Sequence, residues 1–153
     1  MQLIVRMYRL LIQASSNLQS LFLLFVRLYW GYQFHITGRG KLHDIGKVVG
    51  FFTDLGIPAP AFNAYFVSGL EFVGGFLLML GLASRPIALM CVIDMLVAFL
   101  VVSDDREIFK HMFSDPDKFQ AASPYPFLFA FLIVLIFGPG KASVDAFLTR
   151  RWK

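Results

Sequence analysis

Three ionisable residues lie near the middle of strongly apolar stretches of the sequence: Arg27, Glu71 and Asp94. A charge at the centre of an isolated membrane helix costs about 2.5–3.5 kcal/mol on insertion scales, so three such residues require partners. We therefore expect all three to face the interior of a helix bundle and to meet there. Because one guanidinium cannot neutralise two carboxylates, either one acid is protonated near neutral pH or a further cation or ligand group joins them. Arg85, at the end of a predicted helical hairpin, is the candidate second donor.

This predicted cluster has two interpretations. The functional one is a pocket for a quinone head group, or a short proton relay, because carboxyl groups of raised pKa beside aromatic side chains suit both tasks. The other is a buried ion pair that fixes the register of the helices. The spacing selects no reaction type, so both interpretations stay open.

Small residues accompany two of the buried charges. Glu71 is followed at i+3 and i+4 by Gly74 and Gly75, and Arg27 is followed at i+4 by Gly31. Residues at these spacings share one face of a helix, and small side chains there let a second helix approach closely. The pattern therefore predicts tight helix contacts beside both charges.

Other site chemistries find little support in the sequence. Cys91 is the single cysteine, which excludes an internal disulfide, a CxxC redox pair and a cysteine-based metal cluster. No two of His35, His43 and His111 share a helix at i, i+4 spacing. His35 lies at the end of the first predicted span and the other two lie in loops, so we expect neither a metal nor a haem site. The net charge of +4 is spread over loops and tails, which does not predict a nucleic-acid-binding face.

The elements that must position these residues are predicted to be transmembrane helices. The chain of 153 residues is 58% hydrophobic and 16% charged, and its 18 phenylalanines exceed what one water-soluble core can bury. The sequence predicts a single all-α domain, an integral membrane four-helix bundle. Its spans cover about residues 18–36, 61–82, 86–102 and 121–137.

The segments outside these spans also carry predictions. Residues 1–17 have the pattern of an amphipathic helix lying at the membrane surface, although an unstructured terminus is the alternative. Residues 37–41 have turn chemistry that should end the first span, and residues 48–52 should form a short helix. The polar residues 103–124 form the longest candidate surface for a partner. The cations nearest the spans favour cytoplasmic termini.

From Glu71 to Arg85, and in three further pieces that begin at Arg27, Phe51 and Gly138, the sequence resembles the DoxX family of small bacterial and archaeal membrane proteins. The most specific runs from Glu71 through Gly74, Gly75 and Gly81 to Arg85, followed by residues 95–98. The other three pieces begin at Arg27-Leu-Tyr-Trp-Gly31 and continue to Lys41, at Phe51-Phe52, and at Gly138-Pro-Gly-Lys-Ala-Ser-Val-Asp145. The positions that match the family's recurrent ones are Arg27, Gly31, Lys41, Glu71, Gly74, Gly75 and Arg85.

The resemblance implies a four-helix bundle in a bacterial or archaeal plasma membrane. Some members are subunits of thiosulfate:quinone oxidoreductase, and others associate with thiol-redox or superoxide-detoxifying partners. It therefore implies a membrane subunit of a quinone-linked redox complex, with quinone as the candidate cofactor and either a protein partner or a second copy of the chain beside it in the lipid. A non-catalytic anchor or assembly protein is the alternative, and a small transporter subunit is a third possibility.

Overall fold

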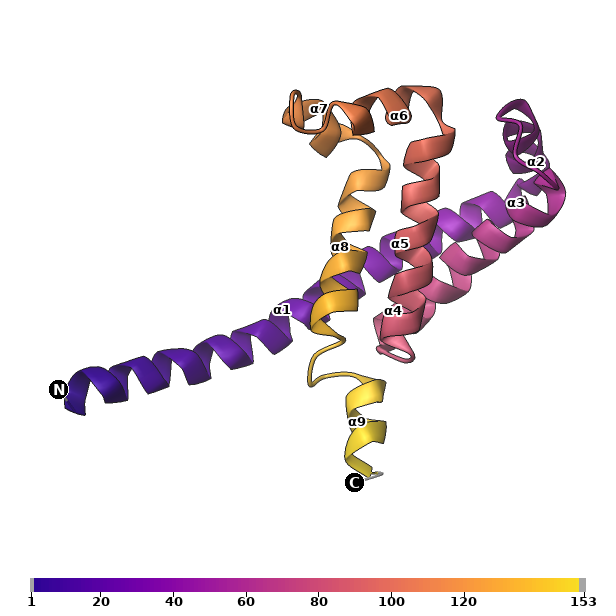
Figure 1. Ribbon diagram of the computed structural model, residues 1–153. Helices are drawn as coiled ribbons and strands as arrows, with labels where there is room; N and C mark the ends of the chain where they lie inside the picture. Colours follow the sequence, from indigo (N-terminus) through magenta and orange to yellow (C-terminus); the bar gives the residue numbers. More distant parts are fainter. Residues whose placement is uncertain (1, 152–153) are drawn as a thin grey trace.

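The computed structural model describes residues 2–151, and within that range the chain is almost entirely helical, with no strand (Figure 1). The all-α prediction is confirmed. The elements are α1 (Gln2–His43), α2 (Ile45–Asp54), α3 (Pro60–Gly69), a π-helical turn (Leu70–Gly74), α4 (Gly75–Leu80), α5 (Ser84–Val101), α6 (Ser103–Lys110), α7 (Pro116–Ala121), α8 (Pro124–Phe137) and α9 (Val144–Arg151).

The first helix is much longer than the sequence predicted. α1 runs without interruption from Gln2 to His43, so the turn expected at residues 37–41 is wrong, and the N-terminal helix continues directly into the first predicted span. Gly38 is buried at a helix crossing, where an added Cβ would lie 2.8 Å from the backbone carbonyl carbon of Glu71. The glycine therefore serves close packing rather than a turn. The N-terminal part of α1 projects away from the other helices (Figure 1).

The second long helix is formed by three consecutive elements. α3, the π-helical turn and α4 together run from Pro60 to Leu80 and lie against the C-terminal half of α1 in the opposite direction. The short helix α2, which contains the predicted helix at residues 48–52, precedes them and packs against α3. Gly81, with φ of 71°, ends α4, and the chain turns back into α5.

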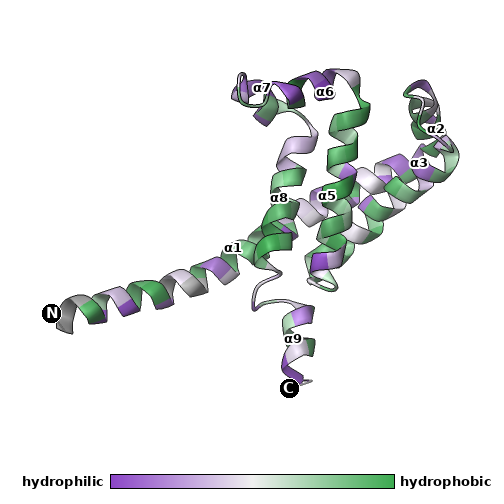
Figure 2. Cartoon of the chain, in the orientation of Figure 1, coloured by the Kyte–Doolittle hydropathy of each residue, from purple (hydrophilic) through white to green (hydrophobic). Residues whose placement is uncertain are grey.

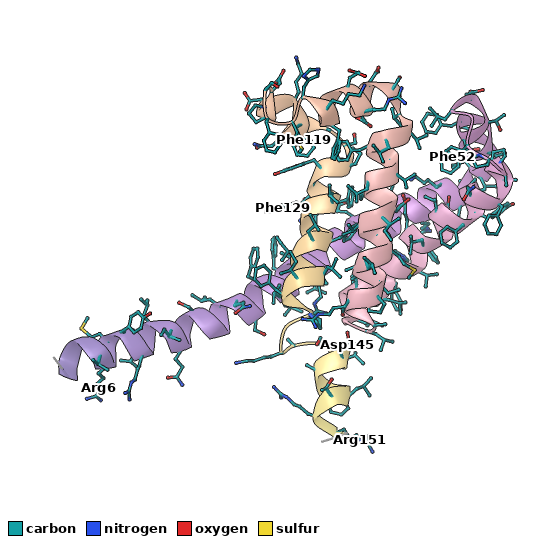
Figure 3. The ribbon with its side chains drawn as sticks, viewed as in Figure 1. Arg6, Phe52, Phe119, Phe129, Asp145 and Arg151 are labelled. Atoms are coloured by element: carbon teal, nitrogen blue, oxygen red, sulfur yellow. The ribbon has the colours of Figure 1, made fainter. Side chains whose placement is uncertain are left out.

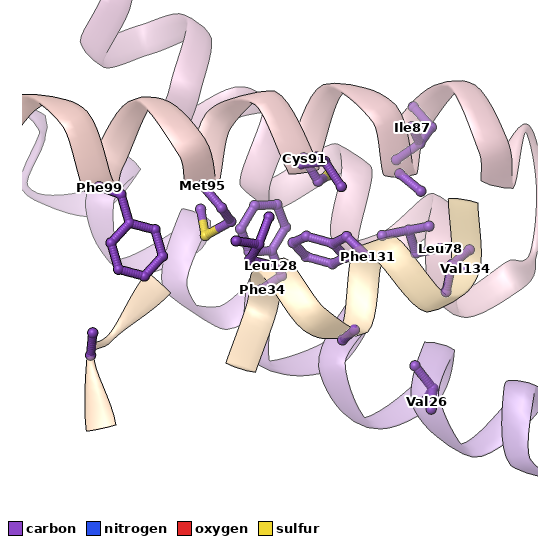
Figure 4. Packing of buried hydrophobic residues seen from close by; sticks show 14 residues of the cluster. Val26, Phe34, Leu78, Ile87, Cys91, Met95, Phe99, Leu128, Phe131 and Val134 are labelled. Carbon is purple, nitrogen blue, oxygen red and sulfur yellow. The ribbon is translucent and has the colours of Figure 1, made fainter. Parts of the chain in front are cut away.

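The main apolar core lies where α5 packs against α8, with α1 and α4 completing it (Figure 4). Phe99, Met95 and Cys91 follow one another along the buried face of α5, and Phe131 of α8 lies opposite them. Phe34 of α1 packs on Phe131 with ring centroids 4.8 Å apart. α8 begins at Pro124 rather than at residue 121, because Ala122 and Ser123 separate it from α7.

The apolar helices carry much hydrophobic surface that the fold does not bury. Two helices, Pro60–Leu80 and Ser84–Val101, are long and apolar enough to cross a membrane, and the shorter α8 is also apolar. Only 33% of the most apolar window of each long helix is buried, whereas the core helix of a water-soluble protein would be mostly buried. Figure 2 shows the contrast between α5 and α8, which are hydrophobic, and the polar helices α6, α7 and α9 at the two ends.

Candidate functional site

A cavity of about 170 Å³ lies among α2, α3, the π-helical turn and α5. Its charged lining residues are Lys41 from α1, Glu71 from the π-helical turn and Asp94 from α5. Phe52, labelled in Figure 3, is on the side of α2 that faces α5. The remaining lining residues are predominantly apolar: Phe51, Leu55, Ile57, Asn63, Val67, Met95, Val97, Ala98, Val101 and Val102.

Lys41 is the cation that meets the buried glutamate. Its Nζ lies 2.5 Å from Oε1 of Glu71, whose side chain is only 2% exposed, while the lysine side chain is 34% exposed. The sequence analysis counted Lys41 among the family-matching positions and did not expect this ion pair, because the predicted turn placed it outside the first span. Continuation of α1 as a helix to His43 carries the lysine alongside Glu71.

Each of the two carboxyl groups has one buried oxygen without a hydrogen-bond partner. Oε2 of Glu71 and Oδ2 of Asp94 are both buried, and neither takes part in a hydrogen bond with the described residues. Buried polar atoms are nearly always hydrogen-bonded in folded proteins, and exceptions tend to occur at functional sites. The structure therefore brings Glu71 and Asp94 to one cavity, as expected, and leaves acceptor capacity there.

Glu71 occupies a local irregularity of its helix. Residues Leu70–Gly74 form a single π-helical turn inside an otherwise α-helical segment, a feature that is frequent at functional sites. His35 of α1 packs on this turn: its Nδ1 donates a hydrogen bond to the carbonyl oxygen of Phe72 at 2.7 Å, and the two rings stack with centroids 4.3 Å apart. His35 thus supports the turn that carries Glu71.

The sequence analysis gave His35 no such role. Its position between Gly31 and Gly38 on one face of α1 is the signal that could have found it, because this face lies against the π-helical turn and α4. An added Cβ at Gly75 would lie 2.5 Å from the backbone nitrogen of His35 and 2.6 Å from the carbonyl oxygen of Gly31. The predicted close contacts at Gly31 and Gly75 are therefore present, and they are made between these two helices.

Gly74 faces the other side of its helix. An added Cβ there would lie 3.3 Å from Cγ2 of Ile87 and 3.7 Å from the sulfur of Cys91, both on α5. The two neighbouring glycines thus allow two different helices to approach the π-helical segment.

The expectation that Arg27 meets Glu71 and Asp94 is wrong. The Arg27 side chain is 1% exposed and donates hydrogen bonds to the carbonyl oxygens of Leu78 at 3.3 Å and Ala142 at 2.5 Å. Leu78 lies seven residues after Glu71, so these contacts are about 10 Å further along the helix. Arg27 therefore holds the segment before α9 against the end of α4.

Asp145 binds the start of α5, near the contacts of Arg27. Its two carboxylate oxygens accept hydrogen bonds from the backbone nitrogens of Ala83 and Ser84, each at 2.8 Å, at the start of α5. Asp145 follows the turn Gly138–Ser143, and Figure 3 shows it below the connection between α4 and α5. Its carboxylate therefore satisfies donors that the first turn of a helix leaves free.

Arg85 is also not part of the cavity. Its side chain is exposed and approaches the carbonyl oxygen of Ile136, at 3.5 Å, near the end of α8. The role of a second donor to Asp94 is therefore wrong for Arg85, because a residue in the first turn of α5 lies more than two turns from Asp94. Among the described residues, no group of three or more histidine, cysteine, aspartate or glutamate side chains could hold a metal ion.

Comparison with known proteins places the chain in a family. Residues 22–104, which include Arg27, Lys41, Glu71 and Asp94, match the DoxX family over a little more than half of the chain. The chain is also 29% identical over 79 residues to the protein named "Putative oxidoreductase CatD" from Bacillus subtilis (strain 168), covering 52% of this chain and 58% of that relative. No solved structure matches the chain. The chain belongs to the DoxX family, a membrane-associated family.

Proposed function

We propose that this protein is a multi-pass membrane subunit of a redox complex and that it binds the head group of a quinone in the cavity lined by Lys41, Glu71 and Asp94. Its membership of the DoxX family and its similarity to a relative named as an oxidoreductase support a redox-associated role. The observation that carries the proposal is that Glu71 and Asp94, each with a buried carboxyl oxygen that lacks a partner, line a cavity whose other walls are mainly apolar and aromatic. An apolar pocket that contains a small number of polar groups is typical of a small-molecule site.

The proposed membrane arrangement has four crossing segments: the central part of α1, Pro60–Leu80, α5 and α8. Each of them exposes large apolar side chains, which lipid would cover. With 14 residues, α8 reaches about 21 Å, less than the hydrocarbon thickness of about 30 Å. Its crossing therefore requires residues on either side of the helix to lie within the membrane. We place this arrangement in a bacterial or archaeal plasma membrane, with cytoplasmic termini.

The size and the edge of the cavity suit a ring with a hydrophobic tail. An apolar cavity of about 150 Å³ is large enough to hold benzene, so 170 Å³ accommodates one six-membered ring. Phe51 and Val97 line the cavity and are 51% and 46% exposed. They form an apolar edge between α2 and α5, through which an isoprenoid tail would extend into the lipid.

A protein partner would dock beside this cavity. The lining residues Val101 and Val102 lead directly into α6, whose exposed side chains include Asp104, Arg106 and Glu107. This polar helix belongs to the stretch 103–124 that the sequence analysis assigned to a partner. It would bring a soluble redox protein close to the bound quinone.

The direct test is to purify the wild type and the Glu71→Gln variant in mild detergent and to measure bound quinone by mass spectrometry of the extracted lipids. Glu107→Gln is the matched control, because Glu107 lies on the exposed face of α6. The buried Cys91 gives a folding check, since its thiol should react with a maleimide dye only after unfolding. We expect quinone with the wild type and the control, and a loss of at least tenfold with folded Glu71→Gln.

Two results would contradict the proposal. If the folded wild type carries no quinone, the cavity is not a quinone site, and the protein is better described as a membrane anchor or assembly factor. If folded Glu71→Gln retains its quinone, the ligand binds elsewhere in the molecule.

A further inference from the structure

The buried carboxyl oxygens of the cavity residues that lack a partner are hydrogen-bond acceptors. Oε2 of Glu71 and Oδ2 of Asp94 have no partner among the described residues. The cationic donor, Nζ of Lys41, uses one of its three N–H groups for Oε1 of Glu71, and the lysine side chain is partly exposed. Asn63 also lines the cavity, but its amide nitrogen donates to the carbonyl oxygen of Pro58 at 2.6 Å. A ligand that satisfies the two unpartnered carboxyl oxygens must therefore bring hydrogen-bond donors.

The two redox forms of a quinone differ in their ability to donate hydrogen bonds. The oxidised ring carries carbonyl oxygens, which only accept hydrogen bonds, whereas the reduced ring carries hydroxyl groups, which also donate. A carbonyl oxygen placed beside an ionised Glu71 or Asp94 would face another acceptor and leave the buried carboxyl oxygen without a partner, which is costly in an apolar site. A hydroxyl group in the same place would donate to it.

We propose that the cavity binds the reduced, hydroquinone form of its ligand in preference to the oxidised quinone. This inference rests on the proposed function and adds the redox form that the site recognises. Glu71 and Asp94 accept the hydroxyl hydrogens, while Lys41 keeps the opposite oxygen of Glu71 occupied and so leaves Oε2 for the ligand. Phe51 and Phe52 provide aromatic surface for the ring.

Binding of three ring compounds to the full-length protein tests the preference. Durohydroquinone carries two donors, its dimethyl ether has a similar ring but no donor, and duroquinone carries two acceptors. The fully substituted ring of duroquinone also avoids addition to thiols and amines. Equilibrium dialysis in detergent micelles, under argon and with protein-free micelles as the blank, gives the three dissociation constants. We expect durohydroquinone to bind at least tenfold more tightly than either of the others.

The Asp94→Asn variant shows whether the carboxyl acceptor causes the preference. Asparagine keeps the shape of the side chain and adds an amide donor that can serve a quinone carbonyl. We expect the dissociation constant of duroquinone to exceed that of durohydroquinone by only about threefold or less in Asp94→Asn. The ratio of these two constants should stay unchanged in the control Asp117→Asn, which is exposed on α7. Reactivity of Cys91 again verifies folding.

The outcomes separate this inference from the proposed function. Equal or tighter binding of duroquinone to the wild type overturns the inference while leaving a quinone site in place. The same holds if the preference is undiminished in folded Asp94→Asn. If none of the three compounds binds to the folded wild type, both the inference and the proposed quinone site fail.

Discussion

The helix pair formed by α1 and Pro60–Leu80 buries a charged side chain at two places, and the groups that contact the charge differ between them. At one, Arg27 donates to the carbonyl oxygens of Leu78 and Ala142, while the carboxylate of Asp145 accepts hydrogen bonds from the backbone nitrogens at the start of α5. At the other, Glu71 is held by Lys41 through one oxygen and keeps its second oxygen free beside Asp94 and a cavity. Arg27 is tied to the surrounding backbone through its two terminal nitrogens, although its Nε has no partner, and it does not line this cavity, whereas Glu71 and Asp94 do.

This difference separates structural from functional charge within one helix pair. Burial alone does not distinguish them, since Arg27 and Glu71 are 1% and 2% exposed. Their surroundings do, because Arg27 donates to backbone carbonyl oxygens of two segments, whereas Glu71 lines a cavity together with a second carboxyl group. We therefore expect substitutions at the Arg27 end to change stability, and substitutions at the Glu71 end to change binding more than stability.

The largest effect should come from Arg27→Met. The substitution removes the donor from the carbonyl oxygen of Ala142 and one of the two donors from that of Leu78, which keeps its bond from the backbone nitrogen of Gly81, and it releases the segment before α9. We expect a loss of about 3 kcal/mol in the free energy of unfolding, because two hydrogen bonds from a charged donor are lost. Thiol labelling of Cys91 against denaturant in detergent measures it. A variant as stable as the wild type would show that Arg27 is not a structural charge.

Gly38→Ala should have the next largest effect. Its new Cβ would press on the backbone of Glu71 and Phe72, which can yield only if the π-helical turn moves. We expect about 2 kcal/mol of destabilisation in the same unfolding assay. Gly40→Ala is the matched control, because nothing lies within 4 Å of a Cβ there and alanine favours a helix by about 0.5–1 kcal/mol. Equal effects at both positions would contradict the close contact at Gly38.

Lys41→Met should have a smaller effect on stability, because the lysine is partly exposed even though its partner is buried. We expect about 1–2 kcal/mol, less than for a fully buried pair, since solvent screens the lysine and can reach it. Lys47→Met, which removes the exposed pair with Asp44, should leave stability unchanged. If both variants unfold at the same denaturant concentration, the ion pair with Glu71 contributes nothing measurable to folding.

The smallest effect is expected for Asp145→Asn. The amide retains one oxygen acceptor but loses the second, so one of the backbone nitrogens of Ala83 and Ser84 loses its partner. Loss of such a helix cap costs about 1 kcal/mol. Hydrogen exchange at the first turn of α5 should increase while exchange in α8 stays the same. Unchanged exchange at Ala83 and Ser84 would show that Asp145 does not cap this helix.

Several parts of this molecule were predictable because local sequence carries the physical signal. The apolar runs at residues 61–82 and 86–102 predicted helices close to those observed, since helical length follows the length of an apolar stretch. The short helix at residues 48–52 is part of α2, and Glu71 and Asp94 reach one cavity as expected. The close contacts of Gly31, Gly74 and Gly75 followed from the spacing of small residues.

Other parts were not predictable because they depend on what lies across the helix interface. The glycines at positions 38 and 40 predicted a turn, since isolated glycine weakens a helix, yet packing against Phe72 and Glu71 keeps α1 continuous. The partner of Glu71 followed from that continuity. The role of His35 depended on a carbonyl oxygen at the π-helical turn, and neither the turn nor its register has a signature in the sequence.

The sequence by itself determined that this is an apolar helical chain of the DoxX family with charges that must be buried. Composition, hydropathy and the spacing of small residues are local properties, and the chain carries them before it folds. Only the tertiary structure decided which charge meets which partner. A buried charge accepts any group that offsets its desolvation, and helix register brings Lys41 to Glu71 and the carbonyl oxygen of Ala142 to Arg27.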